Sequence, residues 1–201
     1  MDAVSCENVS EETRDQSSSG AWFEVRYARI TASKLYEAAH CTTVDGCLVE
    51  TILGATKLKP TKAMRRGLSL EDEVLDVVCK KKKIKARKVG IFLNNKYPIF
   101  AASPDALSAD FCIEIKCPSK DSTFKQYLKN NEITKKPMAQ MQLQMLLVGR
   151  EKGLFCVASP DFEQSRDVSI VEVESNIAFC ENLLQKATSF WQKAIFSKLL
   201  K

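Results

Sequence analysis

The sequence predicts an α/β or α+β domain in which helices flank a short central β-sheet. Two observations lead to this prediction: apolar residues recur at helical spacing in several long segments, and shorter segments rich in branched and aromatic residues lie between them. The chain has 201 residues, of which 45% are hydrophobic and 27% charged, as in one ordinary globular domain. We therefore expect a single domain over residues 21–201, preceded by a polar, acidic tail over residues 1–20 that is disordered.

Helices are expected where apolar residues repeat every three or four positions. In chain order, the expected helices cover 32–39, 48–54, 64–80, 121–130, 138–148 and 175–201. The first of them follows Thr31, a residue type that commonly caps helices. Strands are expected where apolar residues alternate or run together, over 88–94, 99–102, 111–117, 154–158 and 168–173.

The N-terminal segment, the apolar runs and the cysteines indicate where in the cell the protein is expected. The N-terminus has neither the basic start nor the apolar core of a secretory signal, and no apolar run reaches the roughly 20 residues that span a bilayer. The eight cysteines include no Cys-x-x-Cys pair, so His40, Cys41 and Cys47 lack the second cysteine pair of a zinc site. Scattered cysteines of this kind indicate reduced thiols. We expect an intracellular protein, in the nucleus or the cytoplasm, without membrane contact.

A basic run covers residues 80–88. It holds seven of the 30 Lys and Arg residues, so the net charge of +5 comes from this segment and not from a general excess of basic residues. Such a run is typical of a solvated loop, of a nuclear localisation signal or of a strip that binds phosphates. The sequence leaves these alternatives open.

The strand expected over 111–117 is the first candidate for chemistry. Glu114 and Lys116 lie two residues apart and therefore share one face of this strand. Asp105 precedes Glu114 by nine residues, and a short connection between two strands would bring the two carboxylates together. Two carboxylates and the backbone carbonyl of Ile115 would suit Mg²⁺, and Lys116 would orient or deprotonate an attacking water. The alternative is an edge strand with a solvated Glu/Lys pair.

A third acidic residue, Glu71, lies on the apolar stripe of the helix expected over 64–80. It shares this stripe with Leu68, Leu75 and Val78. A carboxylate that faces inward is costly unless it is paired or binds a metal, so Glu71 is a candidate metal ligand. The alternative is that Glu71 lies at a wet edge of the stripe.

The helix expected over 138–148 carries two glutamines, Gln140 and Gln144, one turn apart in a mostly apolar segment. Glutamines in this setting indicate polar contacts to water, to metal-bound solvent or to a nucleic-acid backbone. A solvent-facing stripe would give the same pattern.

These residues fall into four motifs. The motifs are W-x-x-x-R … I-T-A-S over 22–33, G-x-x-x-E over 67–71, S-P-D … E-I-K-C-P over 103–118, and A-Q-x-Q over 139–142. In this order they resemble the lambda-exonuclease group of the PD-(D/E)xK nucleases, which includes the YqaJ-type viral recombinases. The resemblance extends from Trp22 to about Met145, and four ordered motifs are far more specific than a lone Glu-x-Lys. It implies a restriction-endonuclease-like core with a central mixed β-sheet flanked by helices.

The resemblance also implies roles for individual residues. Asp105 and Glu114 would bind the metal, with Glu71 as a further acidic ligand, direct or through water. Lys116 would be the catalytic lysine, and Gln140 would help to position the attacking water. The residues that match the family's grip on the 5′-phosphate of a DNA end are Arg26, Ser33 and Ser103.

This chain departs from the family pattern at two places. Ala106 takes the position of the glycine that follows Asp105 in the family, so the turn there would be shaped differently. The loop after Cys117 has Lys120 and Lys125 but no arginine, which relatives often have there, and we expect Lys120 to bind phosphate.

The implied activity is 5′-to-3′ digestion of double-stranded DNA with Mg²⁺, for which Mn²⁺ would substitute, and we expect two ions. The implied partners are DNA ends, other copies of the chain in a ring-shaped trimer, and a single-strand annealing protein. Two other functions stay open. One is an endonuclease or a nuclease that also cuts RNA with the same site, and the other is a non-catalytic nucleic-acid-binding module.

Overall fold

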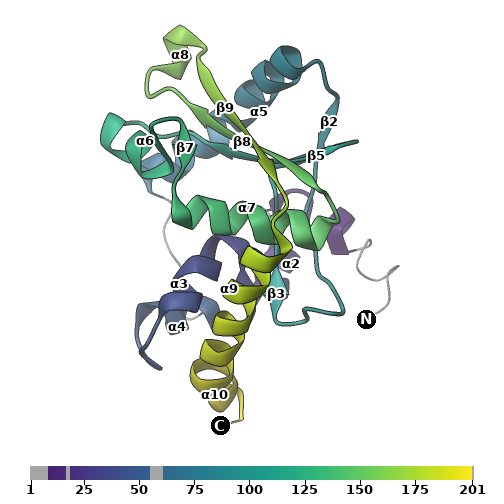
Figure 1. Cartoon of the computed structure of the whole chain (residues 1–201), viewed down its shortest axis with the longest axis vertical. Coiled ribbons are helices and arrows are strands. Elements are labelled where there is room, and N and C mark those ends of the chain that lie inside the picture. The colour runs from purple at the N-terminus through teal and green to yellow at the C-terminus, as the bar shows by residue number, and fades with distance from the viewer. Residues whose placement is uncertain (1–8, 17–18, 55–60, 201) are drawn as a thin grey trace.

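The centre of the computed structural model is a five-stranded mixed β-sheet (Figure 1). The structure describes residues 9–16, 19–54 and 61–200. In spatial order the strands are β2 (Ala86–Lys88), β4 (Ala106–Ser108), β5 (Phe111–Lys116), β8 (Lys152–Ala158) and β9 (Val168–Glu174). β5 and β8 run parallel, whereas the other neighbouring strands are antiparallel. The predicted mixed sheet is confirmed, and β5 has a partner strand on each side.

Two helices cover the sheet, one on each face. α5 (Lys62–Lys82) packs its apolar residues on Ile113 and Ile115. α7 (Lys135–Val148) crosses the opposite face, where it packs against Cys112 (Figure 1). Residues along β5 therefore alternate between the two faces as the sequence predicts.

The ends of these two helices follow from local chemistry. The side chain of Thr61 accepts a hydrogen bond from the backbone N–H of Met64 (3.2 Å), which caps the start of α5. Both helices end at a residue in the left-handed conformation, Lys83 after α5 and Gly149 after α7. The basic run thus begins in the last turn of α5 and continues into β2.

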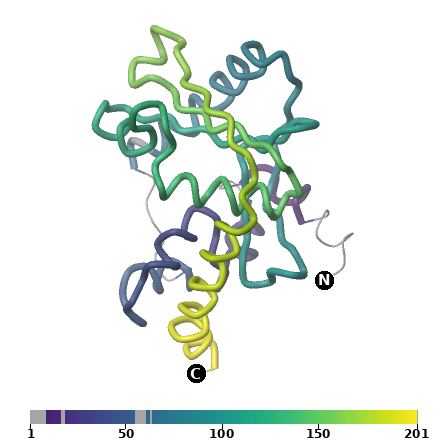
Figure 2. Tube along the Cα trace, viewed as in Figure 1, coloured from purple at the N-terminus to yellow at the C-terminus, as the bar shows by residue number. Residues whose placement is uncertain are grey.

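The lower half of the molecule in Figures 1 and 2 is mainly helical, and its apolar core also includes residues of α7. α3 (Leu35–His40) packs on α9 (Ile177–Phe190), which leads towards the C-terminus. None of the described helices is long and apolar enough to cross a membrane. The shorter elements are α2 (Gly20–Arg26), β1 (Ile30–Thr31), a 3-10 turn (Ala32–Lys34), α4 (Cys47–Ile52), β3 (Phe100–Ala101), α6 (Asp121–Tyr127), β6 (Leu128–Lys129), β7 (Glu132–Ile133), α8 (Phe162–Ser165), a π-helical turn (Trp191–Phe196) and α10 (Ser197–Leu199).

Part of the segment predicted to be a disordered tail, residues 9–16, packs against the chain between β2 and β4. Thr13 Oγ1 accepts a hydrogen bond from the backbone N–H of Ile91 (2.8 Å), and Gln16 Nε2 donates to the carbonyl of Pro104 (3.1 Å). The structure therefore differs from the prediction here. The polar side chains that predicted disorder bind backbone groups of a distant segment, and composition alone does not reveal such partners.

Two further local predictions are wrong. Residues 89–94, predicted to form a strand, make only an isolated bridge, because part of their backbone binds residues 9–16. The helix predicted to reach residue 130 ends earlier, since Asn130 and Asn131 adopt the left-handed conformation and form a tight hairpin between β6 and β7.

Candidate active site

The β4–β5 hairpin brings Asp105 and Glu114 together. In its antiparallel register Ala106 faces Ile113, so the next residues outward, Asp105 and Glu114, stand opposite each other. The backbone N–H of Asp105 donates to the Ile113 carbonyl (3.1 Å), and Asp105 Oδ2 accepts from the backbone N–H of Ile115 (2.6 Å). The approach of the two carboxylates that the short connection predicts is confirmed.

Glu114 is a buried carboxylate, 3% exposed, with hydrogen-bond donors on both oxygens. Its Oε1 accepts from Lys116 Nζ and from Gln140 Nε2 (2.5 Å), and its Oε2 accepts from Gln144 Nε2 (2.6 Å). Because β5 lies inside the sheet, the alternative of a solvated pair on an edge strand is wrong. Gln144 is 1% exposed, so it does not belong to a solvent-facing stripe either.

The candidate site holds more acidic side chains than basic ones. Burial raises the pKa of Asp105 well above its usual range, and the negative charges of Glu114 and Glu71 raise it further, while Lys116 lowers it. Burial acts to lower the pKa of Lys116, but the charges of Glu114 and Asp105 outweigh it and the pKa is raised. Negative charge is therefore concentrated here beyond what one lysine neutralises.

Glu71 lies on α5 at the border of this group. Its side chain is 21% exposed, and burial is the main reason that its pKa is raised, although Lys88 opposes the shift. Lys88 Nζ lies 3.5 Å from Glu71 Oε1 and also pairs with Asp72. Leu68, predicted to share the inward stripe, is 58% exposed, because the part of α5 that packs on the sheet begins at Leu70. Glu71 is thus half-buried and held by a lysine from β2.

The oxygen donors around β5 suit a hard divalent cation. Asp105 and Glu114 supply carboxylates, and their mutual repulsion is the electrostatic condition that a bound cation relieves. Among the residues that the structure describes, no three His, Cys, Asp or Glu side chains are grouped closely enough to hold an ion. Glu71, paired with Lys88, does not complete the group. The donors fit the cation in kind, and the ligand roles of Glu71 and Ile115 remain predictions.

The residues predicted to grip a 5′-phosphate lie on elements that border the site. Trp22 joins two of them: its Nε1 donates to Ser103 Oγ (3.2 Å), and the Arg26 guanidinium lies over its ring, 3.8 Å from the centroid. Burial lowers the pKa of Arg26 to about 10. The Ser33 hydroxyl lies 3.3 Å from that of Thr31, in the 3-10 turn that packs on α7. The structure thus links Arg26 to Ser103, and Ser33 lies in a separate turn.

Arg66, which the sequence analysis missed, fixes the loop that follows β5. Its guanidinium donates to the carbonyls of Cys117 and Pro118 (2.9 Å each) and of Pro160 (3.0 Å). It also binds both carboxylate oxygens of Glu163 (3.0 and 2.7 Å). One side chain on α5 therefore ties together the loops after β5 and β8. A single arginine on a helix gives no sign of this in the sequence.

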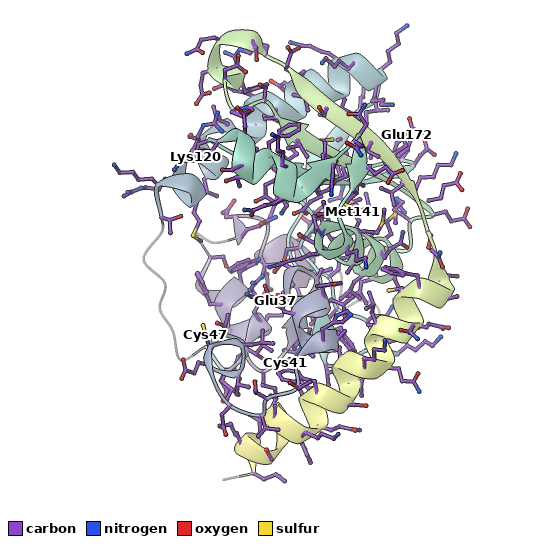
Figure 3. The ribbon with its side chains drawn as sticks, turned by 60° about the vertical axis from the view of Figure 1, so that its left-hand side comes forward. Glu37, Cys41, Cys47, Lys120, Met141 and Glu172 are labelled. Carbon is purple, nitrogen blue, oxygen red and sulfur yellow. The ribbon has the colours of Figure 1, made fainter. Side chains whose placement is uncertain are left out.

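Lys120 is exposed directly before α6, on the side of the molecule shown in Figure 3. Its carbonyl accepts from the backbone N–H groups of Thr123 and Phe124, but its side chain makes no hydrogen bond or ion pair with another described residue, and its binding to phosphate remains a prediction. Cys41 and Cys47 lie in the helical half of the molecule, away from Lys120 (Figure 3).

Comparison with solved structures shows what this fold is similar to. The alkaline exonuclease LHK-Exo of Laribacter hongkongensis, in complex with dAMP, is 24% identical, with a TM-score of 0.74 over 86% of this chain and 91% of LHK-Exo. A phage-related exonuclease of Haemophilus somnus is 15% identical, with a TM-score of 0.61 over 88% and 99% of the two chains. The SOX protein of KSHV, in complex with RNA, is 12% identical, with a TM-score of 0.62 over 93% and 72%. A SOX–DNA complex has a TM-score of 0.57 at 13% identity, over 93% and 70%.

At these identities the similarity shows the fold, and the predicted restriction-endonuclease-like core is confirmed. A search of curated proteins found no match. The family profile described as the YqaJ-like viral recombinase domain matches residues 21–151, a span that contains all ten candidate site residues. The chain therefore belongs to the family of YqaJ-like viral recombinase domains.

Proposed function

We propose that this chain is a divalent-metal-dependent nuclease that digests double-stranded DNA from its 5′ ends. The observation that carries the proposal is the Asp105–Glu114 pair, in which Glu114 is buried and binds Lys116. Membership of the YqaJ-like family and a fold shared with alkaline exonucleases support nuclease activity on DNA.

In this proposal Asp105 and Glu114 hold Mg²⁺, with the carbonyl of Ile115 and the carboxylate of Glu71 as further ligands. Mn²⁺ would substitute, and the number of carboxylates suits two ions. When bound, such an ion stabilises the charge that develops on the phosphate and lowers the pKa of an attacking water. Lys88 keeps Asp72 as a partner when Glu71 turns towards the ion.

In this proposal Lys116 orients or deprotonates the attacking water. The carboxylates of Glu114 and Asp105 raise its pKa, and a cation bound by the same carboxylates would offset that shift. Its ammonium group binds Glu114 Oε1. Gln140 donates to the same oxygen of Glu114 and offers its amide oxygen as an acceptor for the water.

In this proposal four residues bind the 5′-phosphate at the end of the DNA: Arg26, Ser33, Ser103 and Lys120. An arginine offers a forked donor to phosphate oxygens, and the serines add short hydroxyl contacts. Arg26 and Ser103 share contacts with Trp22, so they face the end of the DNA from one supported surface.

RNA is the second candidate substrate for the same site. SOX, which shares the fold, is known in complexes with both DNA and RNA, and a phosphodiester site of this kind does not itself select the sugar. The assay below therefore includes an RNA duplex.

The direct test incubates the protein with 5′-phosphorylated linear duplex DNA and Mg²⁺. We expect release of nucleotides, loss of activity with EDTA, and recovery with Mn²⁺. Glu114→Gln should lower the rate by about a hundredfold or more. Glu172→Gln is the matched control, because Glu172 is an exposed acid on β9 that pairs with Lys82 outside the site. The proposal is contradicted if the wild type leaves the DNA intact both with Mg²⁺ and with Mn²⁺.

Covalently closed circular DNA decides the mode of cutting. An exonuclease leaves it untouched, whereas nicking of the circle at a rate comparable with digestion of linear DNA would identify an endonuclease. Faster digestion of the RNA duplex than of the DNA duplex would favour the second candidate.

A further inference from the structure

Gln144 is a buried polar side chain that contacts Glu114 and the backbone shortly before Asp105. Its Nε2 donates to Glu114 Oε2 (2.6 Å) and lies 3.4 Å from the carbonyl of Ser103, two residues before Asp105. It is 1% exposed, and its Oε1 is buried without a hydrogen-bond partner. A buried amide oxygen without a hydrogen-bond partner is uncommon. The bond that the amide nitrogen donates to Glu114 is therefore the contact that accounts for a glutamine at this position.

The contacts of Glu114 show what that role is. Lys116 and Gln140 both donate to Oε1, whereas Gln144 is the donor described at Oε2. Without Gln144, donors would hold only one of the two oxygens, and the carboxylate would turn about its last bond. The orientation of a carboxylate decides which lone pairs it presents to a cation. Gln144 therefore controls the geometry of Glu114 as a metal ligand without binding the cation itself.

Gln142, two residues away on α7, is a useful comparison. It is also buried, 3% exposed, but it donates to the carbonyl of Glu174 (2.8 Å) and accepts from the backbone N–H of Asn176 (2.7 Å). Both ends of this amide are paired, and both partners lie at the junction between β9 and α9. Gln142 therefore has a structural role, whereas Gln144 has its paired end at the acidic site.

We propose that Gln144 is a positioning residue that fixes the carboxylate of Glu114 for cation binding, an inference that rests on the proposed function. The orientation of its amide follows from the charge, since an amide oxygen in place of Nε2 would face the Glu114 oxygen and be repelled. The bond to the Ser103 carbonyl couples this orientation to the segment that leads into Asp105.

Calorimetric titration with Mn²⁺, in the absence of DNA, tests this role without relying on activity. We compare the wild type with Gln144→Met and Gln142→Met, since both changes replace a buried glutamine on α7 by an apolar side chain of similar volume. We expect Gln144→Met to bind Mn²⁺ about tenfold or more weakly than the wild type. Gln142→Met should bind Mn²⁺ like the wild type, and thermal unfolding should show its cost in stability.

A second variant, Gln144→Asn, keeps the amide but shortens the side chain, so that it no longer reaches Glu114. Its weaker Mn²⁺ binding would support the role even if Gln144→Met did not fold. Wild-type affinity in folded Gln144 variants would overturn this inference and leave the proposed function intact. Absence of Mn²⁺ binding by the wild type would overturn both.

Discussion

The acidic side and the phosphate side of the candidate site are held in different ways. On the acidic side, Glu114 takes hydrogen bonds from β5 and from α7 on both of its oxygens. On the phosphate side, the guanidinium of Arg26 rests on the ring of Trp22, and the side chain of Lys120 is exposed without a partner in the described part of the chain.

The difference follows from charge. Carboxylates that must bind one cation repel each other, so they need donors that fix them before the cation arrives. Cationic side chains that bind a phosphate are drawn to it and need less support in advance. We therefore expect changes on the acidic side to reduce the rate of cleavage, and changes on the phosphate side to alter the choice and the affinity of the substrate.

Removing the lysine of the acidic side should have the largest effect. Lys116→Met is expected to lower the cleavage rate at saturating DNA by about 10²–10⁴-fold, because it removes the group that orients or deprotonates the water and a donor to Glu114. DNA affinity, measured by fluorescence anisotropy, should change little. Lys120→Met is the matched control, with weaker binding and a nearly unchanged rate. Equal losses of rate in both variants would remove the distinction between the two sides.

Removing the charge of Arg26 should have a smaller and more selective effect. Arg26→Met keeps apolar contact with Trp22 but takes away the phosphate donor. We expect the ratio of initial rates on 5′-phosphorylated and 5′-hydroxyl duplexes to fall by about tenfold, the size of one charge-assisted hydrogen bond. Arg29→Met is the control, because Arg29 binds the carbonyls of Val25 and Pro98 and serves the fold. A ratio that matches the wild type would contradict a role for Arg26 at the 5′ end.

The elements around the acidic side could be predicted from the sequence because each carries its own periodicity. The alternation along 111–117 gives β5, which ends at Lys116, and the helix predicted over 138–148 is α7, which starts three residues earlier and ends at Val148. The hairpin register then follows from the short connection between Asp105 and Glu114.

Contacts made by long side chains between distant segments could not be predicted. Lys88 binds Glu71, and Arg66 binds the loop after β5, across separations that no periodic pattern marks. The packing of residues 9–16 depends on backbone groups of the segment around Ile91, and a composition rich in Ser, Glu and Asp predicts disorder with or without such partners.

The basic run is the phosphate-side feature with the smallest expected effect. Acidic side chains pair with three residues of the run, Lys82, Arg87 and Lys88. Three others have no acidic partner among the described residues: Lys80, Lys83 and Lys85. Lys80→Gln/Lys85→Gln should lower the slope of log affinity against log salt by about two units and leave the saturated rate unchanged, since each of the two lost phosphate contacts contributes about one unit. Lys186→Gln/Lys193→Gln removes the same charge from the helical half as a control. Because Lys80 lies nine residues beyond Glu71 on α5, roughly 13 Å along the helix, we expect it to contact phosphates distant from the cleaved bond. An unchanged salt slope would identify the run as a solvated surface, and a loss of saturated rate would place it on the acidic side of the comparison.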